Sequence, residues 1–499
     1  MANETNTSST KWPILGIWTV DGQQETHPGI LYTEGERAYL KLFLAIEDSE
    51  KSFLQGTIED HPHLIPFRPP NRFTVLGETK RSGRVTLLDC AQTSNSGTLH
   101  LQSAKSYIEL TLLVSQAWTG NVFVDYTTKC KELSFAATGL HNVLATSRVE
   151  MEWLARSTPE RHSETHDLHV LTGANQAFLV FRNEEPSAEI EASGKKYKIT
   201  FSTLVQECRS STMGVSFGTE DSISVETEAG ATIPELMAVS YQLEQFLSLL
   251  CIGPFRGEGI KIALDPSKKV ELVWSLGREP RNETLTRMPH QILVGIGQHP
   301  GLAVSALKAW FGANDARRLA RWLIFDSLFK ETSSTAKFLA VAQAWEIIGR
   351  ENVHATPYEK QQFQKACGAA RHALEASLGA EAATRLSHLL QSSNQKAFAD
   401  LVRGVISKIP ALAVQVLCSD VNDFVTALVD ARNVLTHMQG RKNLPIEKAS
   451  YLSLFLTYKL IVLFCIYECA AIGLPLDNLP TMLTNNEMAR AAAHGLPDY

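Results

Sequence analysis

The sequence predicts an α+β protein, with a β-rich antiparallel sandwich or open barrel in the first 300 residues and an all-α bundle after them. Two observations carry this prediction. Up to about residue 230, short apolar runs alternate with turns rich in Gly, Ser, Asn and Asp, and no helical stretch separates them, as is typical of antiparallel sheets. From about Ala303 onward, apolar residues recur every three or four positions, as they do on one face of a helix.

The expected strands follow one another from Trp12 onward. The spacing of apolar residues changes at Ile233 from that of a strand to that of a helix. Pro234 lies in the first turn of this helix, which is expected to run to about Cys251, and Gly253 terminates it. A turn at Glu191–Lys195 predicts a hairpin, and residues 277–292 are expected to form a connecting loop. The strands are predicted at 14–20, 29–32, 38–44, 73–77, 84–90, 98–101, 107–113, 122–136, 188–190, 195–201, 222–226, 261–264 and 270–274.

The last part of the chain contains helices without a repeat of fixed period. Its most apolar run, Tyr451–Leu474, reaches membrane length, but Lys459 and Glu468 interrupt it, so we expect a buried helix and no membrane contact. The helices are predicted at 303–311, 315–329, 334–350, 357–378, 380–390, 394–409, 411–418, 420–437 and 444–472.

A chain of 499 residues is too long for one compact core and indicates two or three domains. We expect a disordered N-terminus, a β-rich domain, a helical region and a C-terminal tail, at residues 1–11, 12–300, 301–480 and 481–499. Eight scattered cysteines and the polar N-terminus predict a cytoplasmic protein without a signal peptide.

The charge balance argues against a general nucleic-acid surface. Residues 1–300 carry 27 Lys and Arg against 36 Asp and Glu, whereas residues 301–499 carry 20 against 17. Any nucleic acid is therefore expected to bind at a local site in the second part.

The predicted helix 420–437 carries the most informative residues. At about 100° per residue, Arg432 falls among the apolar side chains of that helix, and we expect it in the middle of the apolar stripe. Because a guanidinium keeps its charge, a carboxylate, a cavity or an anionic ligand must meet it there. Asn433 and His437, four residues apart, lie at the border of the stripe and complete a set suited to phosphate.

Glu346 lies at the border of the apolar stripe of the predicted helix 334–350. It is a candidate for the carboxylate that meets Arg432 or for a polar group facing RNA, and the alternative is a solvated helix residue. No phosphate-binding loop, dinucleotide fingerprint or zinc-protease motif occurs in the sequence. The pair His61 and His63 flanks a proline in an expected loop, and we predict neither a metal nor a cofactor site.

The stretch Arg432-Asn433-Val434-Leu435-Thr436-His437 resembles the R-[polar]-x3-H signature of HEPN domains, the small helical RNase domains of prokaryotic defence and toxin systems. The phrases Leu15-Gly16-Ile17-Trp18 and Pro28-Gly29-Ile30-Leu31 resemble the start of the N-terminal domain of ApeA-type anti-phage proteins. The segment 338–346 is similar to the first HEPN helix of that family. Together these similarities span most of the chain.

The resemblance implies a bacterial cytoplasmic abortive-infection protein, with a HEPN core at about 334–475 that cleaves RNA without a metal. Arg432, His437, Asn433 and Glu346 would be its catalytic residues, RNA its substrate, with tRNA as one candidate, and a homodimer through the HEPN domain its active form. The β-rich domain would sense a phage-derived trigger or restrain the HEPN domain. The sequence does not identify that trigger. Two alternatives remain: a non-catalytic binding protein in which Arg432 merely holds Glu346, and a ligand-binding β domain that keeps the bundle silent until a phage component arrives.

Overall fold

The computed structural model of the chain describes most of its residues. Predictions for residues 1–11, for His61 and His63, and for most of the loop 277–292 lie outside them. The described residues are 12–20, 24–35, 37–45, 72–80, 82–98, 107–136, 149–154, 168–172, 175–181, 187–211, 214–276, 289–295, 300–330, 332–352, 358–385, 396–440 and 443–496.

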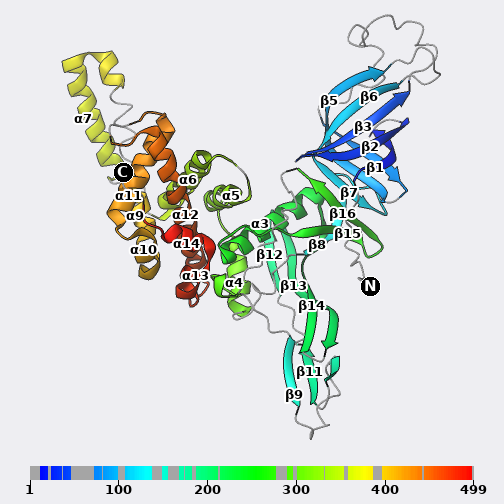
Figure 1. Ribbon diagram of the computed structural model, residues 1–499. Helices are drawn as coiled ribbons and strands as arrows, with labels where there is room; N and C mark the ends of the chain where they lie inside the picture. The colour runs from blue at the N-terminus through cyan, green and yellow to red at the C-terminus, as the bar shows by residue number, and fades with distance from the viewer. Residues whose placement is uncertain are drawn as a thin grey trace, which may run out of the picture.

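Six antiparallel strands at the N-terminal end form a barrel (Figure 1). Their spatial order is β5-β4-β1-β2-β3-β6, and a β5–β6 pairing closes it. The predicted fold class is confirmed, and the closure is a detail that the sequence pattern did not specify. The strands are β1 Ile14–Val20, β2 Thr26–Glu34, β3 Arg37–Ala45, β4 Phe73–Thr79, β5 Gly83–Thr98 and β6 Tyr107–Val114.

The barrel has its own hydrophobic core, centred on Trp18, which is fully buried. Glycines of the neighbouring strands make room for this ring. A Cβ atom on Gly77 would lie 2.3 Å from Cε3 of Trp18, and one on Gly29 would lie 2.8 Å from Cδ1. Both positions therefore exclude larger residues for as long as Trp18 fills the barrel.

The sheet continues from the barrel through the β5–β7 pairing, in the order β7-β16-β15-β8-β14-β13-β12. The predicted hairpin is confirmed, and Ser193 and Gly194 form its turn with φ of 51° and 73°. A separate three-stranded sheet, β10-β11-β9, lies in a region where we predicted no strands. The bounds are β7 Gln116–Gly120, β8 Lys129–Ala136, β9 Val149–Leu154, β10 Leu168–Thr172, β11 Asn175–Phe181, β12 Ser187–Ala192, β13 Lys195–Ser211, β14 Gly214–Thr232, β15 Glu258–Asp265 and β16 Lys268–Ser275.

Helix α3, Ile233–Cys251, begins and ends where the sequence predicts. Thr232 and Glu235 form a capping box at its start, and Glu235 also pairs with Lys195 at 2.6 Å. The hydrogen bond from Lys195 lowers the pKa of Glu235 to about 2. The helix ends at Ile252, which adopts a left-handed conformation with φ of 45°.

The helical region confirms most of the predicted helices. Residues 380–385 are helical, but the rest of the predicted helix 380–390 is not described. The expected tail at 481–499 is wrong as a tail, because two packed helices occupy most of it. The helices are α4 Pro300–Phe311, α5 Asp315–Phe329, α6 Ser334–Asn352, α7 Lys360–Leu378, α9 Phe398–Ile406, α10 Ala411–Cys418, α11 Val421–His437, α12 Ile446–Ala471, α13 Leu479–Asn485 and α14 Glu487–Ala493, preceded by the 3-10 turn Pro289–Gln291.

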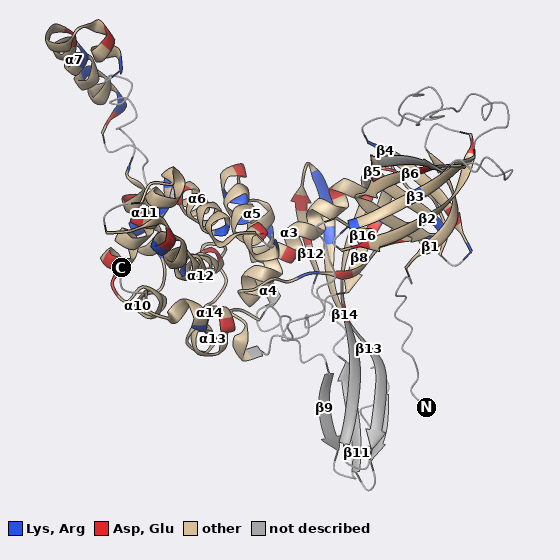
Figure 2. Cartoon of the chain, turned by 45° about the horizontal axis from the view of Figure 1, so that its top comes forward, with Lys and Arg blue, Asp and Glu red and all other residues tan. Residues whose placement is uncertain are grey.

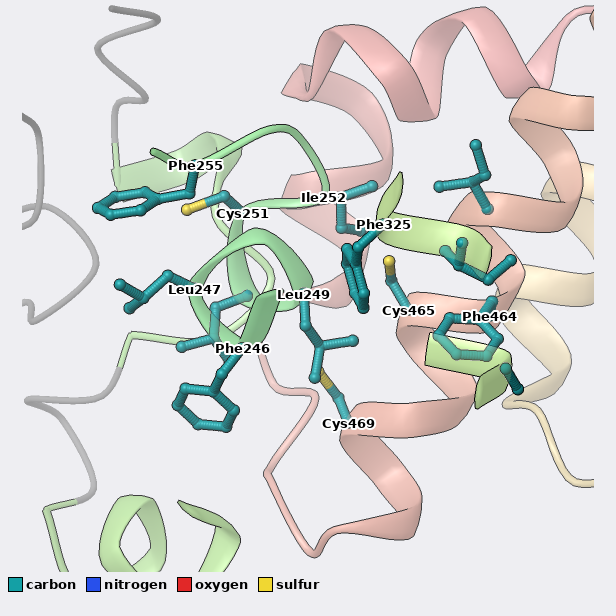
Figure 3. Packing of buried hydrophobic residues seen from close by; sticks show 14 of the residues in the cluster. Phe246, Leu247, Leu249, Cys251, Ile252, Phe255, Phe325, Phe464, Cys465 and Cys469 are labelled. Atoms are coloured by element: carbon teal, nitrogen blue, oxygen red, sulfur yellow. The ribbon is translucent and has the colours of Figure 1, made fainter. Parts of the chain in front are cut away.

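One hydrophobic core joins the second part of the sheet to the helical bundle. Figure 3 shows Leu249 of α3 beside Cys469 of α12, and Ile252, which follows α3, beside Phe325 of α5. Asn486, fully buried at the start of α14, donates hydrogen bonds to the carbonyl oxygens of Cys251 and Gln291. The chain therefore continues its packing across residue 300, where the sequence suggested a domain boundary.

Candidate active site on helix α11

Helix α11 positions the candidate residues near its C-terminal end. The side chain of Asp420 caps the helix and accepts hydrogen bonds from the backbone N–H groups of Asn422 and Asp423 at 2.7 and 2.9 Å. His437 is the last helical residue, because Met438 adopts a left-handed conformation with φ of 50°. The imidazole is therefore exposed at a helix end.

Arg432 lies at the edge of the buried face of α11, whereas we expected it at the centre of that face. The buried residues of α11 centre roughly 80° away from Arg432 at about 100° per residue, and the side chain of Arg432 is 31% exposed. The prediction failed because residues such as Ala427, Ala431 and Val434 extend the buried face to the side opposite Arg432. We expected a carboxylate, a cavity or an anionic ligand to meet this guanidinium, and the structure shows the carboxylate of Glu346.

Three helices hold the side chain of Arg432. Its Nη2 atom donates a hydrogen bond to Oε2 of Glu346 on α6, and its guanidinium lies over the ring of Phe398 on α9, 4.5 Å from the centroid. The other carboxylate oxygen of Glu346 accepts a hydrogen bond from Arg350 at 2.7 Å. Two arginines thus share one carboxylate.

Asn433 and His437 stand apart from this cluster. Asn433 is half-buried and His437 exposed, and among the described residues no hydrogen bond joins either side chain to Arg432 or Glu346. His437 lies about 7 Å along the helix axis from Arg432 and about 140° round it. The structure therefore brings together Arg432 and Glu346, but it does not close all four candidate residues into one compact pocket.

The sequence interpretation missed two residues of the cluster. Arg350 follows Glu346 by four positions on a predicted helix, and that spacing is a signal for a pair. Phe398 carried no comparable signal, because its contact with Arg432 depends on how α9 packs against α11. Cation–π contacts of this kind are visible only once the fold is known.

Comparison with protein families finds two matches in this chain. Residues 13–294 match ApeA N-terminal domain 1, and this match spans more than half of the sequence. The chain belongs to the ApeA family. Residues 339–476 match Apea-like HEPN, and all four candidate residues lie within them. Searches of curated proteins and of solved structures found no match.

The ApeA architecture confirms the resemblance that the sequence motifs suggested. Its two matched regions identify an anti-phage protein that contains a HEPN domain. The HEPN match includes the pair of helices, α6 and α11, that meet through Glu346 and Arg432. Family membership thus places the candidate site within the HEPN domain.

Helix α12 of this ApeA chain is the one described helix long and apolar enough to cross a membrane, and 72% of its apolar window is buried inside the protein. Lys459, 3% exposed, donates to the carbonyl oxygens of Leu417 and Ala492, both at 2.6 Å. Burial lowers the pKa of Lys459. Lys459 is bonded within the protein and every residue from Lys459 to Cys469 is buried, so the predicted buried helix is confirmed for the second half of α12.

The second interruption of α12, Glu468, is fully buried between two arginines of α5. Arg317 donates to it at 2.8 Å and Arg321 at 3.0 Å. Arg321 also lies over the ring of Trp310, 3.8 Å from the centroid, and burial lowers its pKa. This ion cluster fixes α5 against α12 at the border with the β-rich part.

In the view of Figure 2, Lys and Arg, in blue, and Asp and Glu, in red, are both spread over the described helices. Within the described residues, no group of three His, Cys, Asp or Glu side chains is arranged to hold a metal ion. A shallow hollow on α14, lined by Glu487, Arg490 and His494, includes none of the candidate site residues.

Proposed function

We propose that the HEPN domain of this ApeA protein is a metal-independent endoribonuclease that acts in abortive infection in the bacterial cytoplasm. The observation that carries the proposal is that one helix of the HEPN match bears both an anchored Arg432 and an exposed His437. RNA, with tRNA as one candidate, is the substrate.

Arg432 is suited to hold the scissile phosphate. A guanidinium has five N–H donors, and the hydrogen bond to Glu346 uses one of them. The remaining donors can bind phosphate oxygens and stabilise the charge that develops in the transition state. Glu346 and Phe398 restrict the orientations of the guanidinium, so Glu346 acts as a positioning residue in this account.

His437 is suited to move the proton. The ribose 2′-oxygen attacks the adjacent phosphorus while His437 takes its proton, and the bond from phosphorus to the 5′-oxygen breaks. The departing 5′-oxygen receives a proton, which leaves a 2′,3′-cyclic phosphate and a 5′-hydroxyl. Asn433, half-buried one turn before His437, would orient the imidazole or the phosphate.

One imidazole cannot remove a proton and donate another at the same time. Each chain offers one Arg432 and one His437. A homodimer through the HEPN domain would supply a second His437, so that one imidazole acts as the base and the other as the acid. The β-rich part would sense a phage component or restrain the bundle. Its excess of Asp and Glu, 36 against 27 Lys and Arg in residues 1–300, disfavours RNA binding there.

A second function is supported by one observation. The Arg432–Glu346 contact also fits a non-catalytic scaffold, in which the pair only fastens α6 to α11. Incubating RNA with the full-length protein in EDTA, with and without extract from phage-infected cells, separates the two. Cleavage that His437→Ala abolishes supports the ribonuclease, and intact RNA under both conditions supports the scaffold.

A further inference from the structure

The first half of α12 exposes an apolar stripe that the proposed chemistry does not use. Tyr451, Leu454 and Tyr458 are 54%, 40% and 42% exposed, and Phe455 lies half-buried between them. Their spacing of three, four and seven positions places them on one face of the helix. From Lys459 to Cys469, in contrast, every residue of α12 is buried.

The stripe is continuous and carries no charge. The rings of Tyr451 and Phe455 meet edge to face with centroids 5.2 Å apart. No Asp, Glu, Lys or Arg occurs from Ala449 to Tyr458. Single exposed apolar residues are ordinary, but a contiguous apolar face on a soluble protein marks an interaction site.

The chemistry of the stripe favours a protein surface over RNA. Single-stranded RNA stacks on aromatic rings where Lys and Arg also follow its backbone, and this face offers none within its length. Tyrosine in an otherwise apolar face is typical of protein interfaces, since its ring packs while its hydroxyl donates and accepts hydrogen bonds.

The stripe is also able to pack against a second copy of itself. It holds no charge over its length, so two stripes brought face to face bury no like charges and no unpaired ion between them. A two-fold homodimer brings the same patch of both copies together in this way. We propose that the stripe formed by Tyr451, Leu454, Phe455 and Tyr458 is the contact with a second copy of this chain.

The location of the stripe connects it to the candidate site. Only the short segment Met438–Pro445 joins the end of α11 to the start of α12, so His437 lies at the same end of this helix pair as Tyr451. This inference rests on the proposed function, in which a homodimer supplies the second His437.

The stripe forms the centre of an interface and not all of it. Burying the exposed parts of the two tyrosines removes on the order of 200 Å² per copy, whereas a stable interface buries about 800 Å² on each side. Met438, 64% exposed beside His437, is one neighbour that would extend the contact. The central position of Leu454 makes it the most sensitive residue for a test.

The test compares Leu454→Glu with Leu319→Glu in the full-length protein. Leu319 on α5 is a matched control, because it is 47% exposed and lies outside the stripe. Sedimentation velocity over a concentration series should show a wild-type dimer, a dimer of the control and a monomer of Leu454→Glu, with Kd raised at least 100-fold. Circular dichroism spectra and melting curves of all three proteins verify that they are folded.

Cross-linking gives a second readout that does not depend on dissociation. Leu454→Cys should form a disulfide-linked dimer under mild oxidation, and Leu319→Cys and the wild type should not. A monomeric wild type, an unchanged Leu454→Glu dimer, or a stripe that binds labelled RNA instead would overturn the proposal. RNA cleavage is assayed separately: a dimer that depends on Leu454 but does not cleave RNA refutes only the ribonuclease, and a Leu454→Glu protein that stays dimeric and still cleaves RNA refutes only this interface.

Discussion

His437 is exposed and makes no hydrogen bond with another described residue, so its loss should affect chemistry without affecting folding. His437→Ala should lower RNA cleavage by about 100-fold or more, the contribution of a general acid or base. Its free energy of unfolding should stay within about 0.5 kcal/mol of wild type. His494→Ala, another exposed histidine, is the control. Undiminished cleavage by His437→Ala in an RNase assay would remove this residue from the mechanism.

Arg432 and Glu346 allow a sharper distinction between a catalytic and a structural role. Their side chains are 31% and 21% exposed, so solvent screens the pair and its coupling energy should be about 0.5 kcal/mol. Arg432→Ala should therefore abolish cleavage and growth arrest with little loss of stability. A double-mutant cycle with Glu346→Ala, followed by urea unfolding, measures the coupling. A coupling above roughly 3 kcal/mol, together with RNA cleavage that Arg432→Ala leaves unchanged, would mean that the pair is structural and not catalytic.

The sequence allowed part of this site to be predicted, for a physical reason. A guanidinium among apolar residues must be met by a carboxylate, a cavity or an anionic ligand, and Glu346 was a candidate carboxylate because it lies on the border of another apolar stripe. The angular position of Arg432 was predicted wrongly, because alanines widen the buried face of α11. Phe398 could not be predicted, since its contact arises from tertiary packing alone.

Among the elements, α12 depends most on buried charges. Glu468→Ala would leave Arg317 and Arg321 without their carboxylate, and loss of one partner of a buried ion pair costs about 3–5 kcal/mol. Urea unfolding should show that loss, whereas Glu447→Ala, exposed on the first turn of the same helix, should change little. Equal stabilities of the two variants would mean that the ion cluster does not fasten α5 to α12.

Lys459 predicts a pH dependence of stability. Because burial lowers its pKa in the folded state, the unfolded chain binds the proton more tightly. The contribution to stability is complete above the unfolded pKa of about 10.4 and is lost as the pH falls through the folded pKa. Compared at pH 8 and pH 10 by urea unfolding, wild type should gain stability relative to Lys459→Met at the higher pH. A difference between the two proteins that does not change with pH would contradict this.

The elements themselves were predicted with uneven success. Helix α3 was found at its bounds because proline in the first turn and Gly253 after the end are local signals. The barrel closure was not, since β5 and β6 meet across a connection whose path no local pattern specifies. The final helices α13 and α14 were missed because they are only seven residues each.

At the scale of the whole molecule, the β-rich part divides into a barrel with its own core and a sheet that shares the core of the bundle. Removing residues 1–300 would therefore strip α3 from Phe325 and Cys469 and should yield unfolded protein. The sensing role is better tested within the barrel, where Gly77→Val would clash with Trp18. This variant should lose the barrel and the response to phage while the bundle stays folded.

Two measurements check that expectation. Hydrogen exchange should increase in residues 14–114 of Gly77→Val and remain slow in α11 and α12, and plaque assays should show lost protection. Gly301→Ala is the control, because a Cβ there meets no atom within 4 Å. Protection retained despite a disrupted barrel would place the sensor elsewhere.

The central claim is that Arg432 and His437 of the HEPN domain cut RNA when phage infects the cell. The most direct measurement expresses wild type and His437→Ala during phage challenge and maps the ends of cellular RNA. The account predicts new fragments with 2′,3′-cyclic phosphate and 5′-hydroxyl ends in wild-type cells alone. The same fragments in both strains, or protection from phage without any such fragments, would contradict it.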